Sequence, residues 1–204
     1  MRMKITALFL FLTLIAIPSK AQAETAGARE AVEAFLKTIR AVESPAADLA
    51  AHEKSVAAAN IYLDLEALNQ KALGDHWAEM SDEAKKTFND LMWKLIEFVA
   101  YPKSQKFMGD YEITYPEVKP TASGAEVHSV IKQQAEGLDA VVIYSLHQEN
   151  QQWKVDDVVL DGVSITEDLK YQFDKLIEQS GFEGLLAKMR ERLAQARKDA
   201  GLPE

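Results

Sequence analysis

The sequence lacks cysteine entirely, and basic residues are in the minority. Without cysteine no disulfide, no thiolate nucleophile and no lipid-modified thiol is possible. Lysine and arginine together number 23, against 32 aspartate and glutamate residues, which gives a formal net charge of −9. An excess of acid argues against nucleic acid as a partner and against unaided attraction to anionic membrane surfaces.

The N-terminus does carry positive charge, and it predicts a secretion signal. Arg2 and Lys4 precede an uncharged apolar run over residues 5–17, and Ala21 and Ala23 occupy the −3 and −1 positions of a cleavage site. That run is too short for a membrane span, which needs about 20 residues. We expect cleavage after Ala23 and a periplasmic mature protein. Removing three basic residues and no acids leaves 20 basic against 32 acidic residues, a net charge of −12.

Hydrophobic periodicity divides the mature chain into helices, strands and helices again. Helical spacing dominates residues 26–100, alternation dominates 110–162, and helical spacing returns over 166–198. Ser81, followed by two acids, is expected to cap the clearest helix, which we end at Ala100, and Thr166 to cap the first C-terminal helix, which Gly181 ends. Four strands with short connections predict an antiparallel meander. The fold class is therefore α+β: a twisted four-stranded antiparallel sheet surrounded by helices, in one domain over 24–204.

The third strand is apolar on both faces at residues 141–144, and the fourth at 158–160. If one face of an antiparallel sheet were exposed to water, apolar and polar residues would alternate along each strand instead. One face can pack on helices, so the other must meet further helices or something that is not protein. Helices facing a two-sided apolar sheet can enclose a pocket.

The sequence contains only weak candidates for catalytic or metal-binding motifs. His76 and Glu79 lie three apart on a helix, with Asp75 adjacent, but no second ligand cluster accompanies them. Ser164 follows a single glycine and lacks the pattern of a nucleophile elbow, which makes it a turn residue. A curved sheet could still host acid–base catalysis if a buried aspartate faced Tyr144. We expect no catalytic residue, no metal site and no cofactor.

A specific resemblance adds to this interpretation. Residues 153–164, WKVDDVVLDGVS, resemble the WKVxDVxxEGVS signature of the toluene-tolerance (MlaC) family. The similarity continues through residues 171–173, 181–186 and 189–192, and upstream through 64–77. Leu63 stands where the family usually has phenylalanine, and Pro102 breaks the third helix earlier than expected. These departures bear on the ligand more than on the fold.

The resemblance implies a periplasmic phospholipid-binding protein that works with an ABC transporter. Such proteins carry phospholipid between an outer-membrane lipoprotein complex and the inner-membrane transporter complex, which maintains outer-membrane lipid asymmetry. Their sheet and helices surround a deep apolar cavity. A branch of the family is linked to hopanoids, rigid polycyclic lipids, which stay an alternative ligand.

A lipid carrier, a curved-sheet enzyme and a plain interaction module remain open from the residues alone. For the carrier, apolar residues on the predicted strands and helices are candidate pocket walls: Trp77, Met92, Ile96, Val142, Tyr144 and Val155. The acidic mature chain suggests recognition by basic rims on partner complexes. The basic side of the last helix, residues 188–198, is either a solvated face or a surface that approaches lipid headgroups.

Overall fold

The computed structural model describes residues 25–109, 112–132 and 139–202. The expected signal peptide and the turn expected at 136–137 lie outside the described residues. The helices are α2 (Ala28–Arg40), α3 (Leu49–Asn60), α4 (Leu65–Leu73), α5 (Asp75–Glu79), α6 (Asp82–Leu95), the π-helix η1 (Ile96–Ala100), α7 (Tyr101–Met108) and α8 (Ile165–Asp199). The strands are β1 (Glu112–Pro120), β2 (Ala125–Lys132), β3 (Asp139–Glu149), β4 (Gln152–Leu160) and β5 (Val163–Ser164). No helix among the described residues has the length and apolarity to span a bilayer.

The strands form one antiparallel sheet in the order β1-β2-β3-β4-β5, which confirms the predicted meander and α+β class. A bulge between Thr114 and Glu117 absorbs Pro116, so β1 continues to Pro120. The two-residue β5 adds an edge strand that was not predicted, because two residues are too few for a periodic signal.

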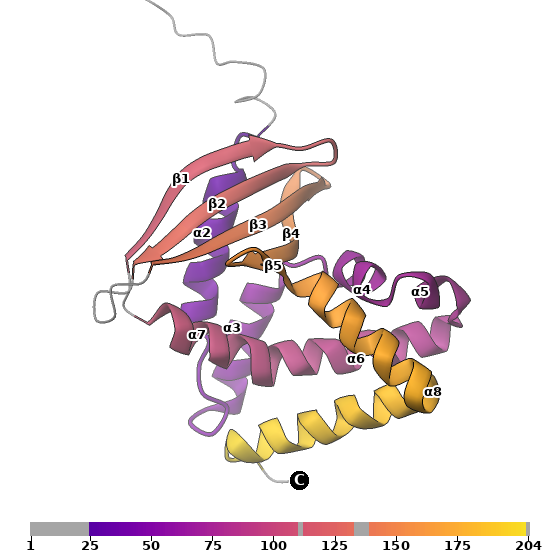
Figure 1. The fold of residues 1–204 in the computed structure, drawn as a ribbon. Coiled ribbons are helices and arrows are strands. Elements are labelled where there is room, and N and C mark those ends of the chain that lie inside the picture. Colours follow the sequence, from indigo (N-terminus) through magenta and orange to yellow (C-terminus); the bar gives the residue numbers. More distant parts are fainter. Residues whose placement is uncertain (1–24, 110–111, 133–138, 203–204) are drawn as a thin grey trace, which may run out of the picture.

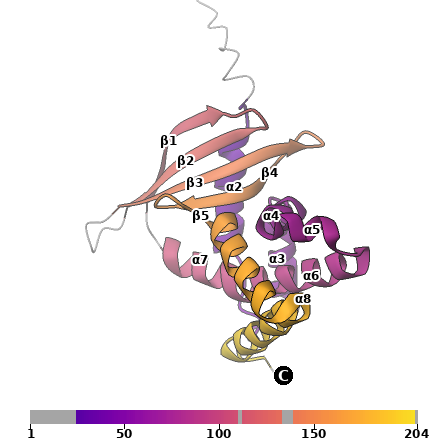
Figure 2. The same ribbon diagram turned by 45° about the vertical axis from the view of Figure 1, so that its right-hand side comes forward.

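The helices lie on one side of the sheet (Figures 1 and 2). α2 runs across the inner face, and the remaining helices form a layer beneath the strands. On β2 and β3 the side chains that face these helices are buried, with Val127 and Ile131 at most 1% exposed and Val142 at 4%. Alternation along the strands therefore separates a buried inner face from an outer face.

The outer face is apolar at its centre, as predicted, but no described segment covers it. Val141 pairs with Val130 there, and Val141 is 43% exposed. The neighbouring Ile143 and Val159 are half-buried. Of the two expectations for this second apolar face, cover by further helices is therefore wrong for Val141 among the described residues.

One helix cap agrees with the prediction from the sequence, and two helix ends differ from it. The Ser81 hydroxyl accepts the Ala84 amide at 3.2 Å, as its sequence context predicted. The helix does not end at Ala100: it passes through the π-helix η1 into α7, which contains Pro102 near its start. At α8 the cap is Ser164 rather than Thr166, because the Ser164 hydroxyl accepts the Glu167 amide.

The predicted end of the first C-terminal helix at Gly181 corresponds to a sharp kink in α8. Gly181 has φ 68° and ψ 177°, a left-handed conformation that side chains with a Cβ rarely adopt. The second half of α8 turns there and lies at the end of the molecule opposite the sheet (Figure 1).

Candidate functional site

Five of the six predicted wall residues lie in one continuous apolar core between the sheet and the helices. Val142, Tyr144 and Val155 belong to the inner face of the sheet, and Met92 and Ile96 to α6 and η1. Their exposed fractions run from 1% at Val155 to 9% at Ile96. The sequence thus identified residues that share one interior.

Trp77, the sixth, lies at the margin of this core. It belongs to the five-residue α5, which lies beside α4 at the edge of the helical layer (Figure 1). Its side chain is half-buried, and the Lys85 ammonium lies 5.5 Å from the ring centroid, a cation–π contact. Gly74 separates α4 from α5, so the helical spacing of apolar residues along α4 does not predict which way Trp77 faces.

The interior reaches solvent along one row of paired residues on the inner face. Val142 pairs with Leu160, and Leu160 pairs with Val163. Exposure rises along this row from 4% through 36% to 60%. Ile165, the first residue of α8, is 43% exposed beside it. An apolar path therefore leads from the open β5 edge to the buried wall. Leu160 and Val163 could not be predicted as members of this path, because the pairing register between strands is not visible in the sequence of one strand.

The Tyr144 hydroxyl does not form part of an acid–base pair with an aspartate. Burial, and next the negative potential of Tyr115, raise the pKa of Tyr144 well above its ordinary value, opposed by a hydrogen bond with Ser129 and the charge of Arg40. No carboxyl group of the described chain acts on it. Among those residues the one buried carboxyl group is Glu97, whose Oε1 lies 2.9 Å from His52 Nε2. Tyr144 is thus a neutral residue of the apolar core.

The signature at residues 153–164 builds the corner between β4 and α8. One Asp157 oxygen accepts the Ser164 hydroxyl at 2.7 Å, and the other accepts the Thr166 amide at 3.1 Å. Asp161 accepts the Val141 amide at 2.9 Å, which extends the β3–β4 pairing past the strand end. At the start of the signature, Trp153 Nε1 donates to the Ala26 carbonyl. These residues hold the fold and present no chemistry of their own.

We predict that Asp157→Ala lowers the free energy of unfolding by about 3 kcal/mol, because it leaves the donors around a carboxylate without their acceptor. Urea unfolding monitored by circular dichroism measures the loss. Glu149→Ala, which removes an exposed acid at the end of β3, should change stability by less than about 0.5 kcal/mol. If the two variants were equally stable, Asp157 would not have the structural role proposed here.

A second polar cluster ties the helical layer to the sheet. His147 Nε2 lies 3.0 Å from Asp64 Oδ2, and Nδ1 lies 2.9 Å from Asp156 Oδ2. Lys71 Nζ lies 2.8 Å from the other oxygen of Asp156. Both ring nitrogens of His147 therefore face carboxylate oxygens, one from each side. Residue spacing could not predict this cluster, because both carboxylates come from elements other than the strand of His147.

The weak metal candidates stay without support. His76 Nε2 lies 3.2 Å from Asp174 Oδ1 on α8, an ion pair between helices. Within the described ranges, no group of three histidine, aspartate or glutamate side chains is arranged to hold a metal ion.

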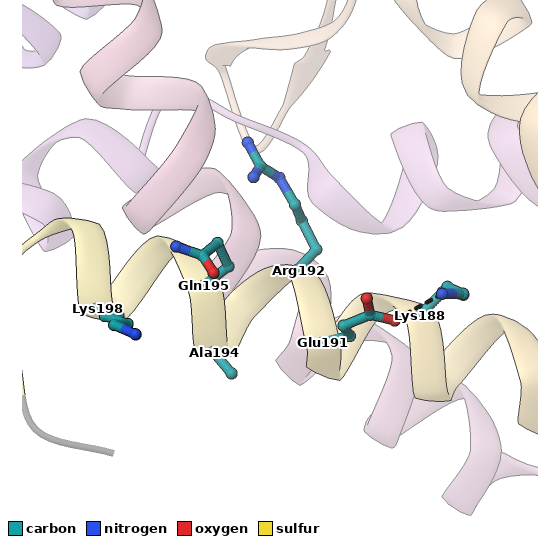
Figure 3. A pocket seen from close by; sticks show the side chains of 6 residues that line it. All are labelled: Lys188, Glu191, Arg192, Ala194, Gln195 and Lys198. Carbon is teal, nitrogen blue, oxygen red and sulfur yellow. Dashed lines mark hydrogen bonds and ion pairs between the residues drawn. The ribbon is translucent and has the colours of Figure 1, made fainter.

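An open surface hollow of about 540 Å³ lies along the second half of α8 (Figure 3). It is lined by Lys188, Glu191, Arg192, Ala194, Gln195 and Lys198. None of the predicted wall residues lines it, so this hollow is separate from the apolar interior.

Together these features define an α+β protein with a one-sided antiparallel sheet, an apolar interior and an apolar path to solvent at the sheet edge. The chain belongs to the MlaC protein family, whose model matches residues 29–191. Members of this family are periplasmic lipid carriers and not enzymes. No curated protein matches the chain significantly in sequence.

A solved structure shares the fold. A phospholipid-binding protein from Ralstonia solanacearum, determined in complex with a phospholipid, superimposes with a TM-score of 0.66 at 21% sequence identity. The match covers 85% of this chain and 98% of that chain.

Proposed function

We propose that this protein is a periplasmic phospholipid carrier that holds acyl chains between the inner face of its sheet and its helical layer. The observation that carries the proposal is the row from exposed Val163 to buried Val142, in a chain of the MlaC family. It offers hydrocarbon an apolar route from the molecular edge to the interior. The phospholipid bound by the Ralstonia protein supports the choice of ligand.

Transfer energies explain why a carrier is needed. Each methylene exposed to water costs about 0.8 kcal/mol, so a phospholipid cannot cross the periplasm with bare acyl chains. An apolar interior resembles the interior of a bilayer, so transfer between the two is nearly neutral. Near-neutral transfer lets the protein both load and unload. Direction then comes from the partners, an inner-membrane ABC transporter complex and an outer-membrane lipoprotein complex.

Loading requires the sheet to move relative to the helices. The wall residues are buried against one another, so acyl chains can enter only if the two layers separate. The cluster around His147 fastens the middle of β4, at Asp156, to the N-cap of α4, at Asp64. Strand β4 ends at Leu160, on the apolar path. We infer that the layers part at the Leu160 end while the attachment at His147 is kept.

Mass spectrometry of lipids extracted from the processed protein, purified from the periplasm, tests this function. We expect phospholipid at a defined ratio to protein. If the only lipid found were polycyclic and contained no phosphate, we would conclude that the ligand is a hopanoid and not a phospholipid. Protein without any bound lipid, and unable to take up phospholipid from vesicles, would contradict the proposal.

A further inference from the structure

The second half of α8 carries positive charge on an otherwise acidic molecule. Residues 188–198 contain five basic side chains and one acid, whereas the whole chain has a net charge of −9. The α8 surface around the hollow is defined here as the basic face of α8 and comprises Lys188, Glu191, Arg192, Ala194, Gln195 and Lys198. Net charge alone had argued against anionic surfaces, but it averages over this local asymmetry.

Two of the three cations on the basic face have no partner in the described structure. Lys188 Nζ lies 2.6 Å from Glu191 Oε2, and the two side chains are 61% and 70% exposed. Arg192 and Lys198 make no hydrogen bond or ion pair with any described residue, and both are exposed. Figure 3 shows Arg192 extending from one side of the helix while Lys188 and Glu191 point toward each other. Two charges are thus left for an external anion.

The basic face has no large apolar side chain. Its one apolar member is Ala194, because Leu185, Leu186 and Met189 are turned inward into the core. A helix that inserts into a bilayer needs bulky apolar residues beside its basic ones. Contact with this face would therefore be electrostatic, superficial and readily reversed by salt.

We propose that the basic face of α8 docks the protein on the anionic surface of a phospholipid bilayer. Each unpaired cation near such a surface strengthens binding about fivefold, and attraction fades beyond about 8 Å at physiological ionic strength. Docking of this strength is weak and reversible, as a protein that must leave the membrane again requires. The basic face lies at the end of the molecule opposite the sheet, so docking there does not involve the apolar path.

Vesicle co-sedimentation of the processed protein tests the proposal with matched variants. One is Arg192→Gln with Lys198→Gln; the control is Lys54→Gln with Lys103→Gln, which changes net charge equally at two exposed lysines without partners in the described structure. The vesicles contain one part phosphatidylglycerol to two parts phosphatidylcholine, or phosphatidylcholine alone. We expect the native protein to bind the anionic vesicles at low salt. The basic-face variant should lose about 20-fold in apparent affinity, and the control variant less than about twofold.

Three outcomes would overturn the proposal. Absence of binding by the native protein to anionic vesicles would leave the basic face to another partner, such as an acidic protein. Equal loss in both variants would assign the effect to net charge. Equal binding to both kinds of vesicle would exclude an electrostatic dock. Co-purified phospholipid, measured on the same samples, should be unchanged in both variants, so failure of docking is distinguishable from failure of the carrier function.

Discussion

Val142→Asp should reduce the phospholipid that co-purifies with the protein by at least about tenfold, whereas Val141→Asp should leave it within about twofold of the native amount. The two residues are neighbours on β3 and point to opposite faces of the sheet. Val142 is 4% exposed on the proposed wall, and Val141 is 43% exposed on the outer face. A carboxylate in an apolar wall must lose its hydration without a partner, a penalty larger than the 1.4 kcal/mol that a tenfold change in affinity represents. Extracted lipid phosphate per mole of folded protein measures the effect.

Leu160→Asp keeps this test decisive, since an aspartate at position 142 also weakens the fold. Leu160 pairs with Val142 and is 36% exposed, so its replacement leaves the carboxylate hydrated in the lipid-free protein. We expect a folded variant that has lost several-fold in bound phospholipid. A folded Val142→Asp protein that retains its lipid would refute the wall assignment, and a normal Leu160→Asp protein would refute the path.

Phe88→Ala should produce the largest loss of stability, about 4 kcal/mol in the free energy of unfolding. Phe88 on α6 is fully buried. Its ring meets Phe173 edge-on at a centroid distance of 5.6 Å and lies 6.3 Å from the ring of Phe182. These two partners lie on either side of the Gly181 kink, so Phe88 holds both halves of α8 against α6. Removing the ring leaves a cavity at the point where three helical segments meet.

The matched control is Tyr171→Ala, an aromatic residue on α8 that is 69% exposed. Its removal should change stability by less than about 0.5 kcal/mol. Urea unfolding of both variants, followed by tryptophan fluorescence, gives the comparison. A loss below about 1 kcal/mol for Phe88→Ala would show that the angle of α8 is set elsewhere.

Local patterns predicted the elements of this fold well. Helical spacing and the cap at Ser81 are properties of neighbouring residues, and so is the alternation in β2 and β3. The meander followed from short connections between strands. The same local information placed Met92, Ile96, Val142, Tyr144 and Val155 in one interior, because each was judged by the apolar face on which it lies.

Features that depend on contacts between residues far apart in the sequence could not be predicted. The path through Leu160 and Val163 exists because the three strands β3, β4 and β5 pair in one particular register. The partners of His147 come from Asp64 and Asp156, on different elements. The open outer face at Val141 depends on where the helices pack. That face was predicted to be covered on the assumption that apolar strand residues must be enclosed; here they are shielded only in part by their own strand neighbours.

The central claim is that acyl chains lie between the inner face of the sheet and the helical layer. Its most direct test is photo-crosslinking with a phospholipid that carries a diazirine near the end of one acyl chain, followed by peptide sequencing in a mass spectrometer. We expect adducts on residues of both layers, such as Met92 and Ile96 from the helices and Val142 and Tyr144 from the sheet. Adducts confined to the outer sheet face around Val141, or to the basic face of α8, would contradict it.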